Sequence, residues 1–186
     1  WGLVTFSKYP IVGRGLVNFK EKDDNACIYT DIEVNDKTLR VFNTHLASIK
    51  LDKHDYKAMQ EINQNQYSED FGNEMMMVNK IKYGFQRRAQ QADSIRKSLD
   101  NSPFPTILCG DFNDTPSSYA YNQIKGEYQD AFMKAGSGLG RTYIGEFPSF
   151  RIDYIFMDEN FKITDFNTHS EKLSDHHPIS ANFLLN

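Results

Sequence analysis

Hydrophobic and polar residues alternate along two stretches near the start of the chain. Residues 26–34 read Ala-Cys-Ile-Tyr-Thr-Asp-Ile-Glu-Val, and residues 38–44 resume the alternation after Asn35-Asp-Lys37. A period of two places successive side chains on opposite faces of a strand, and a short polar segment between two such runs is typical of a hairpin turn. The pattern therefore predicts a β-hairpin. A weaker alternation over residues 2–6 predicts an earlier strand, followed by a loop through Gly15.

Apolar residues change their spacing between positions 50 and 100, where charged and amide residues dominate. They recur there at helical intervals in two groups separated near residues 71–73. This spacing predicts two helices, the second packed on a sheet. The two groups are Tyr56, Met59 and Ile62, then Met76, Ile81, Phe85, Ala89, Ala92, Ile95 and Leu99.

Two sets of side chains on the second predicted helix admit more than one interpretation. The consecutive methionines at 75–77 could form a binding surface, but helical methionines usually fill gaps in a core, so we expect them to be buried. The basic residues Arg87, Arg88, Arg96 and Lys97 form either a solvated face or part of a site.

The second half of the chain contains one buried strand, one helix and three further strands. The apolar run 106–109 predicts the buried strand, and Thr115 with Pro116 predicts the start of a helix that continues to about Ile124. The final strands are expected at residues 150–156, 161–166 and 178–184. A chain of 186 residues can bury a core without disulfides, so we expect a single α/β domain over residues 1–186.

Composition narrows the function classes. Charged residues make up 25% of the chain and the formal net charge is −4, so no broad basic field favours binding of nucleic acid without sequence preference. Cys27 and Cys109 lie in apolar runs and are expected in the core, although a disulfide remains open. No apolar run approaches the roughly 18 residues of a membrane span.

Polar side chains at the end of the 106–109 strand form the first candidate site. Gly110 is followed by Asp111, Asn113 and Asp114, whose oxygens are suited to a hard cation or to contacts around a phosphate. The alternative is an ordinary Asp/Asn-rich turn after a strand.

Two further candidates stand in or after predicted strands. Asp153 lies within an apolar run, where an ionised carboxylate is costly without a partner. Its expected partner is a histidine in Ser174-Asp-His-His-Pro178, and the alternatives are Arg151 or Arg14. His45 ends the second hairpin strand, where it is either a site residue or a hydrogen-bonded strand-end residue.

These motifs together resemble the endonuclease/exonuclease/phosphatase superfamily of DNase I-like, metal-dependent phosphoesterases. The resemblance rests on five segments in the family's order. They are Ser7-Lys-Tyr-Pro-Ile11, Asn43-Thr-His-Leu46, Gly110-Asp-Phe-Asn113, Arg151-Ile-Asp-Tyr-Ile155 and Ser174-Asp-His-His-Pro178, with Arg87, Arg88 and Gln91 resembling the family's Arg-x-x-Gln.

The resemblance implies a four-layer α/β sandwich of two mixed β-sheets flanked by helices. The family's opening strands, which carry an Asn and a metal-binding Glu, have no counterpart before Trp1, so the match covers about the C-terminal two-thirds of a family domain. We therefore expect weak metal affinity and unpaired strand edges. Such edges would be completed by a missing N-terminal segment or by a dimer.

The resemblance also implies roles for particular residues. His176 is expected as general base or phosphate contact, oriented by Asp153, and Asp175 as a ligand of Mg²⁺ or Mn²⁺. Asp111 is expected to act on the leaving oxygen or hold a second ion, Asn113 to orient phosphate or nucleophile, and His45 to stabilise developing charge. His177 is expected to be structural.

The function predicted on this basis is metal-dependent hydrolysis of a phosphoester, with a small phosphoester, sugar phosphate or lipid headgroup favoured over nucleic acid by the low positive charge. A nuclease is the alternative, and a noncatalytic binding module on the same scaffold is the alternative from another class. Specificity is expected to depend on residues 64–83 and 134–150. The chain is predicted to be a soluble domain of unknown compartment, whose parent could be exported or membrane-anchored.

Overall fold

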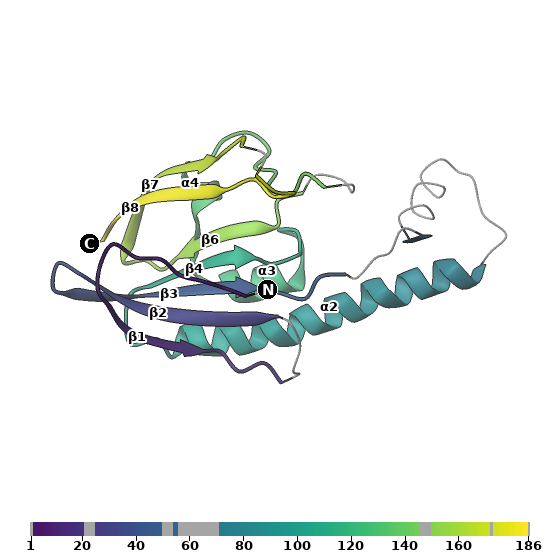
Figure 1. The fold of residues 1–186 in the computed structure, drawn as a ribbon, viewed down its shortest axis with the longest axis horizontal. Helices are drawn as coiled ribbons and strands as arrows, with labels where there is room; N and C mark the ends of the chain where they lie inside the picture. Colours follow the sequence, from purple (N-terminus) through teal and green to yellow (C-terminus); the bar gives the residue numbers. More distant parts are fainter. Residues whose placement is uncertain are drawn as a thin grey trace.

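The computed structural model describes residues 2–20, 25–49, 54–55, 71–145, 150–171 and 173–185, with side chains from residue 75 onward in the long helix. The predicted α/β fold with two sheets is confirmed (Figure 1). The strands are β1 (Ile11–Leu16), β2 (Ala26–Val34), β3 (Lys37–His45), β4 (Thr106–Asp111), β5 (Gln129–Asp130), β6 (Asp153–Met157), β7 (Phe161–Thr168) and β8 (Ile179–Leu185). The helices treated below are α2 (Phe71–Asp100), α3 (Tyr119–Lys125) and α4 (Ala131–Ala135).

The larger sheet has six strands in the order β1-β2-β3-β4-β6-β5. The β3–β4 pair is parallel and the other pairs are antiparallel, so the sheet is mixed. The parallel pair requires a long crossover, which α2 provides between β3 and β4. The smaller sheet consists of the antiparallel pair β7–β8.

The predicted hairpin is confirmed as β2 and β3. Its turn residues Asn35 and Asp36 both have positive φ, 50° and 62°. A two-residue hairpin turn of this kind matches the right-handed twist of the strands, and Asn and Asp tolerate the left-handed conformation better than most residues. The turn sets the register in which Ala26 pairs with His45 at the opposite end of the hairpin.

The first predicted strand is misplaced. Residues 2–6 form no strand, and the strand β1 lies where the sequence indicated a loop. Gly13 and Gly15 explain the difference, because a Cβ at either position would lie 2.5 Å from the side chain of Asp31 or Tyr29 on β2. The glycines that suggested a loop are therefore what allows β1 to pair beside two bulky side chains.

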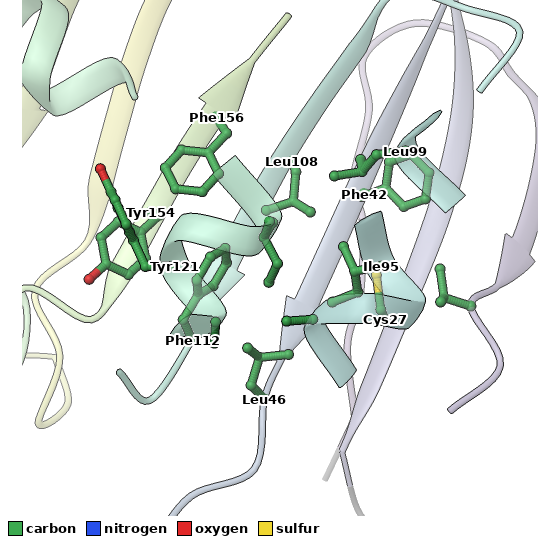
Figure 2. Packing of buried hydrophobic residues seen from close by; sticks show 14 residues of the cluster. Cys27, Phe42, Leu46, Ile95, Leu99, Leu108, Phe112, Tyr121, Tyr154 and Phe156 are labelled. Atoms are coloured by element: carbon green, nitrogen blue, oxygen red, sulfur yellow. The ribbon is translucent and has the colours of Figure 1, made fainter. Parts of the chain in front are cut away.

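Two apolar clusters occupy opposite faces of the six-stranded sheet. Against α2 and α3, the cluster includes Cys27, Phe42 and Leu108 from the sheet with Ile95 and Leu99 from α2 (Figure 2). Against the smaller sheet, Ile32, Leu39 and Ile107 pack with residues of β7 and β8. The central strands are thus buried on both faces, and the predicted core positions on α2 from Ala92 to Leu99 are confirmed.

The methionine prediction is wrong for two of the three residues. Met77 is buried, but Met75 and Met76 are each 57% exposed. The N-terminal half of α2 extends beyond the sheet, as Figure 1 shows, so these side chains have no sheet surface to pack against. Residues 71–83, which we expected to form part of a specificity loop, belong to this helix.

Several other expectations need correction or lie outside the described residues. The N-cap of α3 is Ser118, whose side chain accepts from the Tyr121 amide, and not Thr115; the Ser118 amide instead donates to the Thr115 carbonyl in a preceding turn. Cys27 and Cys109 are free thiols. The first predicted helix, around residues 56–62, is outside the described part of the chain. No described helix is long and apolar enough to cross a membrane.

Candidate active site

Strand register brings three of the candidate residues together. His45 on β3 pairs with Asp111 on β4, and Asp111 in turn pairs with Asp153 on β6. The three residues therefore lie side by side across adjacent strands at one end of the sheet. This arrangement requires glycine at position 110. Its φ is 149°, and a Cβ there would lie 1.9 Å from the Thr44 carbonyl oxygen on the neighbouring strand.

His176 joins this group through Asp153. The His176 Nδ1 and the Asp153 Oδ2 are 2.8 Å apart, and both side chains are partly buried. The alternative partners are not used: Arg151 donates to Asp130, and Arg14 lies on β1, separated from β6 by three strands. The Thr142 hydroxyl accepts from the Asp153 amide, which anchors the start of β6.

The carboxylate of Asp153 accepts a hydrogen bond from the His176 Nδ1 and so favours the charged form of the ring. Because the bonded carboxylate favours the imidazolium, the pKa of His176 is raised to about 9, against the opposing effect of burial. Asp111 and Asp175 act in the same direction through their charges. In the metal-free protein His176 is therefore cationic at neutral pH.

Asp111 is a carboxyl group in an unfavourable place for a negative charge. Burial has the largest effect and the charge of the neighbouring Asp153 the next largest, and together they raise the pKa of Asp111 to about 7. The backbone N–H of Asn113 donates to the Asp111 Oδ1 at 2.7 Å, which acts in the opposite direction. Ligand atoms of Asp111, Asp153 and His176 all lie within 4.8 Å of one another. A cation bound by Asp111 would offset the penalty on its negative charge, so this carboxylate is suited to ligate a hard divalent ion.

His45 lies at the edge of this group with a different electrostatic environment. Its Nε2 is 3.5 Å from the Asp111 Oδ2, and 43% of its side chain is exposed. Burial and the positive His176 lower the pKa of His45. The pKa values of the two site histidines are therefore shifted in opposite directions, which favours the neutral form of His45 and the charged form of His176.

Asn113 and Asp114 take different directions after β4. Asn113 adopts a positive φ of 50° and donates through Nδ2 to the Leu46 carbonyl, beside the His45 ring. Asp114 is buried and accepts from Arg88, so it does not join the carboxylates of the site. The oxygen cluster expected at residues 111–114 is thus divided between the site and the core.

Asp175 is not part of the compact group. Its residue is exposed, and its backbone carbonyl accepts from the Ile144 amide. The structure thus places the predicted metal ligand at the rim, near enough for its charge to act on His176. The neighbouring His177 donates its backbone amide to the Thr142 carbonyl, and its expected structural role stays a prediction.

Sequence analysis missed Asn25 and left the role of Arg88 open. The Asn25 Nδ2 lies 3.2 Å from the His45 Nδ1 and donates to the Leu46 carbonyl. Arg88, only 1% exposed, donates to Asp114 and to the Ala47 carbonyl, while the Gln91 side chain accepts from the Ala47 amide. No local pattern marks Asn25, but the Arg-x-x-Gln resemblance did mark Arg88 and Gln91.

Comparisons with known proteins bear on the family and the fold of the chain. The model of the Endonuclease/Exonuclease/phosphatase family matches residues 1–176. No curated protein matches the chain significantly.

Several solved structures share the fold at low sequence identity. A mannosyl-6-phosphatase from Bacteroides thetaiotaomicron is similar with a TM-score of 0.67 and 17% identity, over 96% of this chain and 68% of that one. The human Nocturnin catalytic domain with bound sulfate has a TM-score of 0.65 and 15% identity, over 96% and 60%. D. rerio TDP2 complexed with a single-strand DNA product has a TM-score of 0.62 and 13% identity, over 94% and 68%. At these identities the likeness concerns the fold, and none of these comparisons supports the expected dimer.

Proposed function

Since the chain belongs to the endonuclease/exonuclease/phosphatase family, we propose that it hydrolyses phosphoester bonds of small substrates with the help of Mg²⁺ or Mn²⁺. The observation that carries this proposal is the group of Asp111, Asp153 and His176, whose ligand atoms lie within 4.8 Å of one another. We further propose that residues 1–186 act as one domain in this reaction.

The roles proposed for the histidines follow from their charges. A cationic His176, held by Asp153, is suited to contact a nonbridging oxygen of the phosphate, so of its two expected roles we favour the phosphate contact. A neutral His45 is suited to donate a hydrogen bond to charge that develops on the phosphate. The proposed role of Asn113 is to orient the phosphate or the nucleophile, and it is supported by the bond from its side-chain Nδ2 to the Leu46 carbonyl, beside the His45 ring.

The proposed cation ligands are Asp111 and, at the rim, Asp175. When bound there, a divalent ion would supply neutralisation of phosphate charge. Asp153 is already bonded to His176, so few carboxylates remain for an ion, and we expect weak Mg²⁺ affinity, with a Kd on the order of 10⁻³ M. Calorimetric titration measures it, and binding tighter by several orders of magnitude contradicts this ligand assignment.

The substrate class is a separate proposal. The fold neighbour that is a mannosyl-6-phosphatase and the formal net charge of −4 favour a sugar phosphate or another small phosphoester. The fold neighbour described with a single-strand DNA product supports nucleic acid as the alternative substrate. A noncatalytic binding module on the same scaffold is the remaining alternative.

The test is hydrolysis by the chain in Mg²⁺, in Mn²⁺ and in EDTA. The substrates are p-nitrophenyl phosphate, bis(p-nitrophenyl) phosphate, mannose 6-phosphate and a single-stranded oligonucleotide. We expect metal-dependent release of product that is lost in His176→Ala and retained in His169→Ala, since His169 contacts Ser180 on the smaller sheet. Activity that survives substitution of Asp111, Asp153 and His176 contradicts the proposed site, and no hydrolysis of any substrate favours the binding module.

A further inference from the structure

Asn25 lies immediately before β2 and contacts both His45 and the residue that follows it. Its Nδ2 is 3.0 Å from the Leu46 carbonyl oxygen and 3.2 Å from the His45 Nδ1. A carbonyl oxygen can only accept a hydrogen bond, so the amide atom that faces it must be the nitrogen. With the amide turned the other way, two oxygens would face each other at this distance.

The orientation of the Asn25 amide determines what the His45 Nδ1 can be. The NH₂ group has two hydrogens, one of which serves the Leu46 carbonyl while the other is directed at the ring. A protonated Nδ1 would place two donors against each other. The Nδ1 therefore carries a lone pair, and in the neutral ring the proton is on Nε2.

A second amide competes for the same ring. The Asn113 Nδ2, which also donates to the Leu46 carbonyl, is 3.4 Å from the His45 Nε2 and would favour the opposite tautomer. Two observations decide between them. The Asn25 contact is the shorter, and the Asp111 carboxyl oxygen Oδ2 lies 3.5 Å from Nε2 and favours a proton there, whereas the described contacts of Nδ1 provide only a donor.

We infer that Asn25 is a positioning residue that holds His45 as the neutral tautomer with its proton on Nε2. Because the His45 side chain is 43% exposed beside Asp111, this N–H is available to a phosphate oxygen in the site. His45 then acts as a hydrogen-bond donor and does not deliver a proton to the leaving group. The tautomer rests on the hydrogen bonds alone, while its use on a phosphate rests on the proposed function.

The test is long-range ¹H–¹⁵N NMR of the histidine rings in metal-free, ¹⁵N-labelled protein at neutral pH. The chain has five histidines, and the signals lost in His45→Gln identify His45. We expect a lone-pair nitrogen at Nδ1 and a protonated nitrogen at Nε2. A proton on Nδ1, alone or with one on Nε2, overturns the inference, and this measurement requires no variant of Asn25.

Asn25→Asp provides the second measurement, because a carboxylate accepts a hydrogen bond where the amide donates one. We expect a proton on Nδ1 in this variant and a fall in kcat/KM of about tenfold or more. Asn18→Asp is the matched control: it makes the same change of charge at an exposed residue in the loop after β1 and should leave both readouts unchanged. Unaltered ring nitrogens in Asn25→Asp overturn the inference, even if the rate falls.

Different results would contradict the proposed function and the inference about Asn25. If the wild-type chain hydrolyses no phosphoester but the ring nitrogens behave as expected, the proposed function is wrong and the role of Asn25 in holding the tautomer is confirmed. If hydrolysis is found with the proton on Nδ1, the proposed function stands and the inference about Asn25 is wrong.

Discussion

The carboxylate of Asp153 and the ring of His176 are joined by a hydrogen bond of 2.8 Å between Oδ2 and Nδ1, although 22 residues separate them in the sequence. Asp153 begins β6, beside Asp111 on β4, and His176 lies in the segment before β8. The bond orients the ring and leaves its Nε2 for the site.

Asp153→Asn should lower kcat by about 10- to 100-fold, the usual effect of removing a carboxylate that orients a functional histidine. The amide cannot stabilise the imidazolium as a carboxylate does, so His176 loses both its orientation and its charge. Steady-state kinetics with p-nitrophenyl phosphate measures the effect. Asp36→Asn, at the exposed turn between β2 and β3, makes the same chemical change and should leave kcat unchanged.

The Asp153–His176 pair should stabilise the metal-free protein in a pH-dependent way. The pKa of His176 is raised in the folded state from an ordinary 6.5 to about 9, so its stabilising contribution is fully present below pH 6.5 and is lost as the pH rises through 9. Urea unfolding of the wild type and Asp153→Asn in EDTA should therefore show a difference that is largest near pH 6 and small near pH 10. A difference that grows toward pH 10 contradicts the assignment.

Asp111→Asn should stabilise the metal-free protein at pH 8 while it abolishes hydrolysis. The folded-state pKa of Asp111 is raised from 3.8 to about 7, so at pH 8 the folded protein holds an unfavourable charge that the unfolded chain carries without penalty. The neutral amide removes this penalty and can still accept from the Asn113 amide. Urea unfolding at pH 8 and at pH 4 checks the sign, because the gain should disappear where Asp111 is protonated.

Arg88→Met should destabilise the protein by about 3–5 kcal/mol, because it leaves the buried Asp114 carboxylate without its cation. The same change removes the hydrogen bond from Arg88 to the Ala47 carbonyl, two residues after His45, so activity should also fall. Arg14→Met makes the same chemical change at an exposed position of β1 and should cost less than about 1 kcal/mol. Unfolding in urea compares the two variants.

A double variant separates the two effects of Arg88. Arg88→Met combined with Asp114→Asn removes both charges, so much of the lost stability should return. If activity stays low while stability recovers, Arg88 acts on the site through Ala47. If both recover together, the ion pair has only a role in folding.

The local sequence pattern was sufficient to predict those strands and turns whose geometry depends on neighbouring residues in the chain. The hairpin β2–β3 follows from its alternation and from Asn35 and Asp36, which tolerate the left-handed turn. The strand β4, whose last two residues are Gly110 and Asp111, follows from an apolar run and a glycine. The same pattern failed at β1, since Gly13 and Gly15 indicate a loop until the bulky side chains of β2 are known.

In the site, too, some features could be predicted from the sequence and others depend on distant partners. Asp111, Asp153, His176, Asn113 and His45 could be selected from residue type and the order of motifs, because carboxylates and histidines at strand ends are chemically conspicuous. Residue type did not reveal that Asp114 turns into the core or that Asn25 faces His45, since both depend on partners 20 or more positions away in the sequence. The exposure of Met75 and Met76 likewise depends on where the sheet ends.

For this protein, then, strand and turn identities and the chemical types in the site were readable along the chain, because short-range sterics and hydrophobic periodicity act on neighbouring residues. The register that aligns His45, Asp111 and Asp153, the opposite directions in which the pKa values of His45 and His176 are shifted, and the tautomer we infer for His45 required the folded molecule. Hydrogen bonds and desolvation act through space, and only packing determines which groups they join.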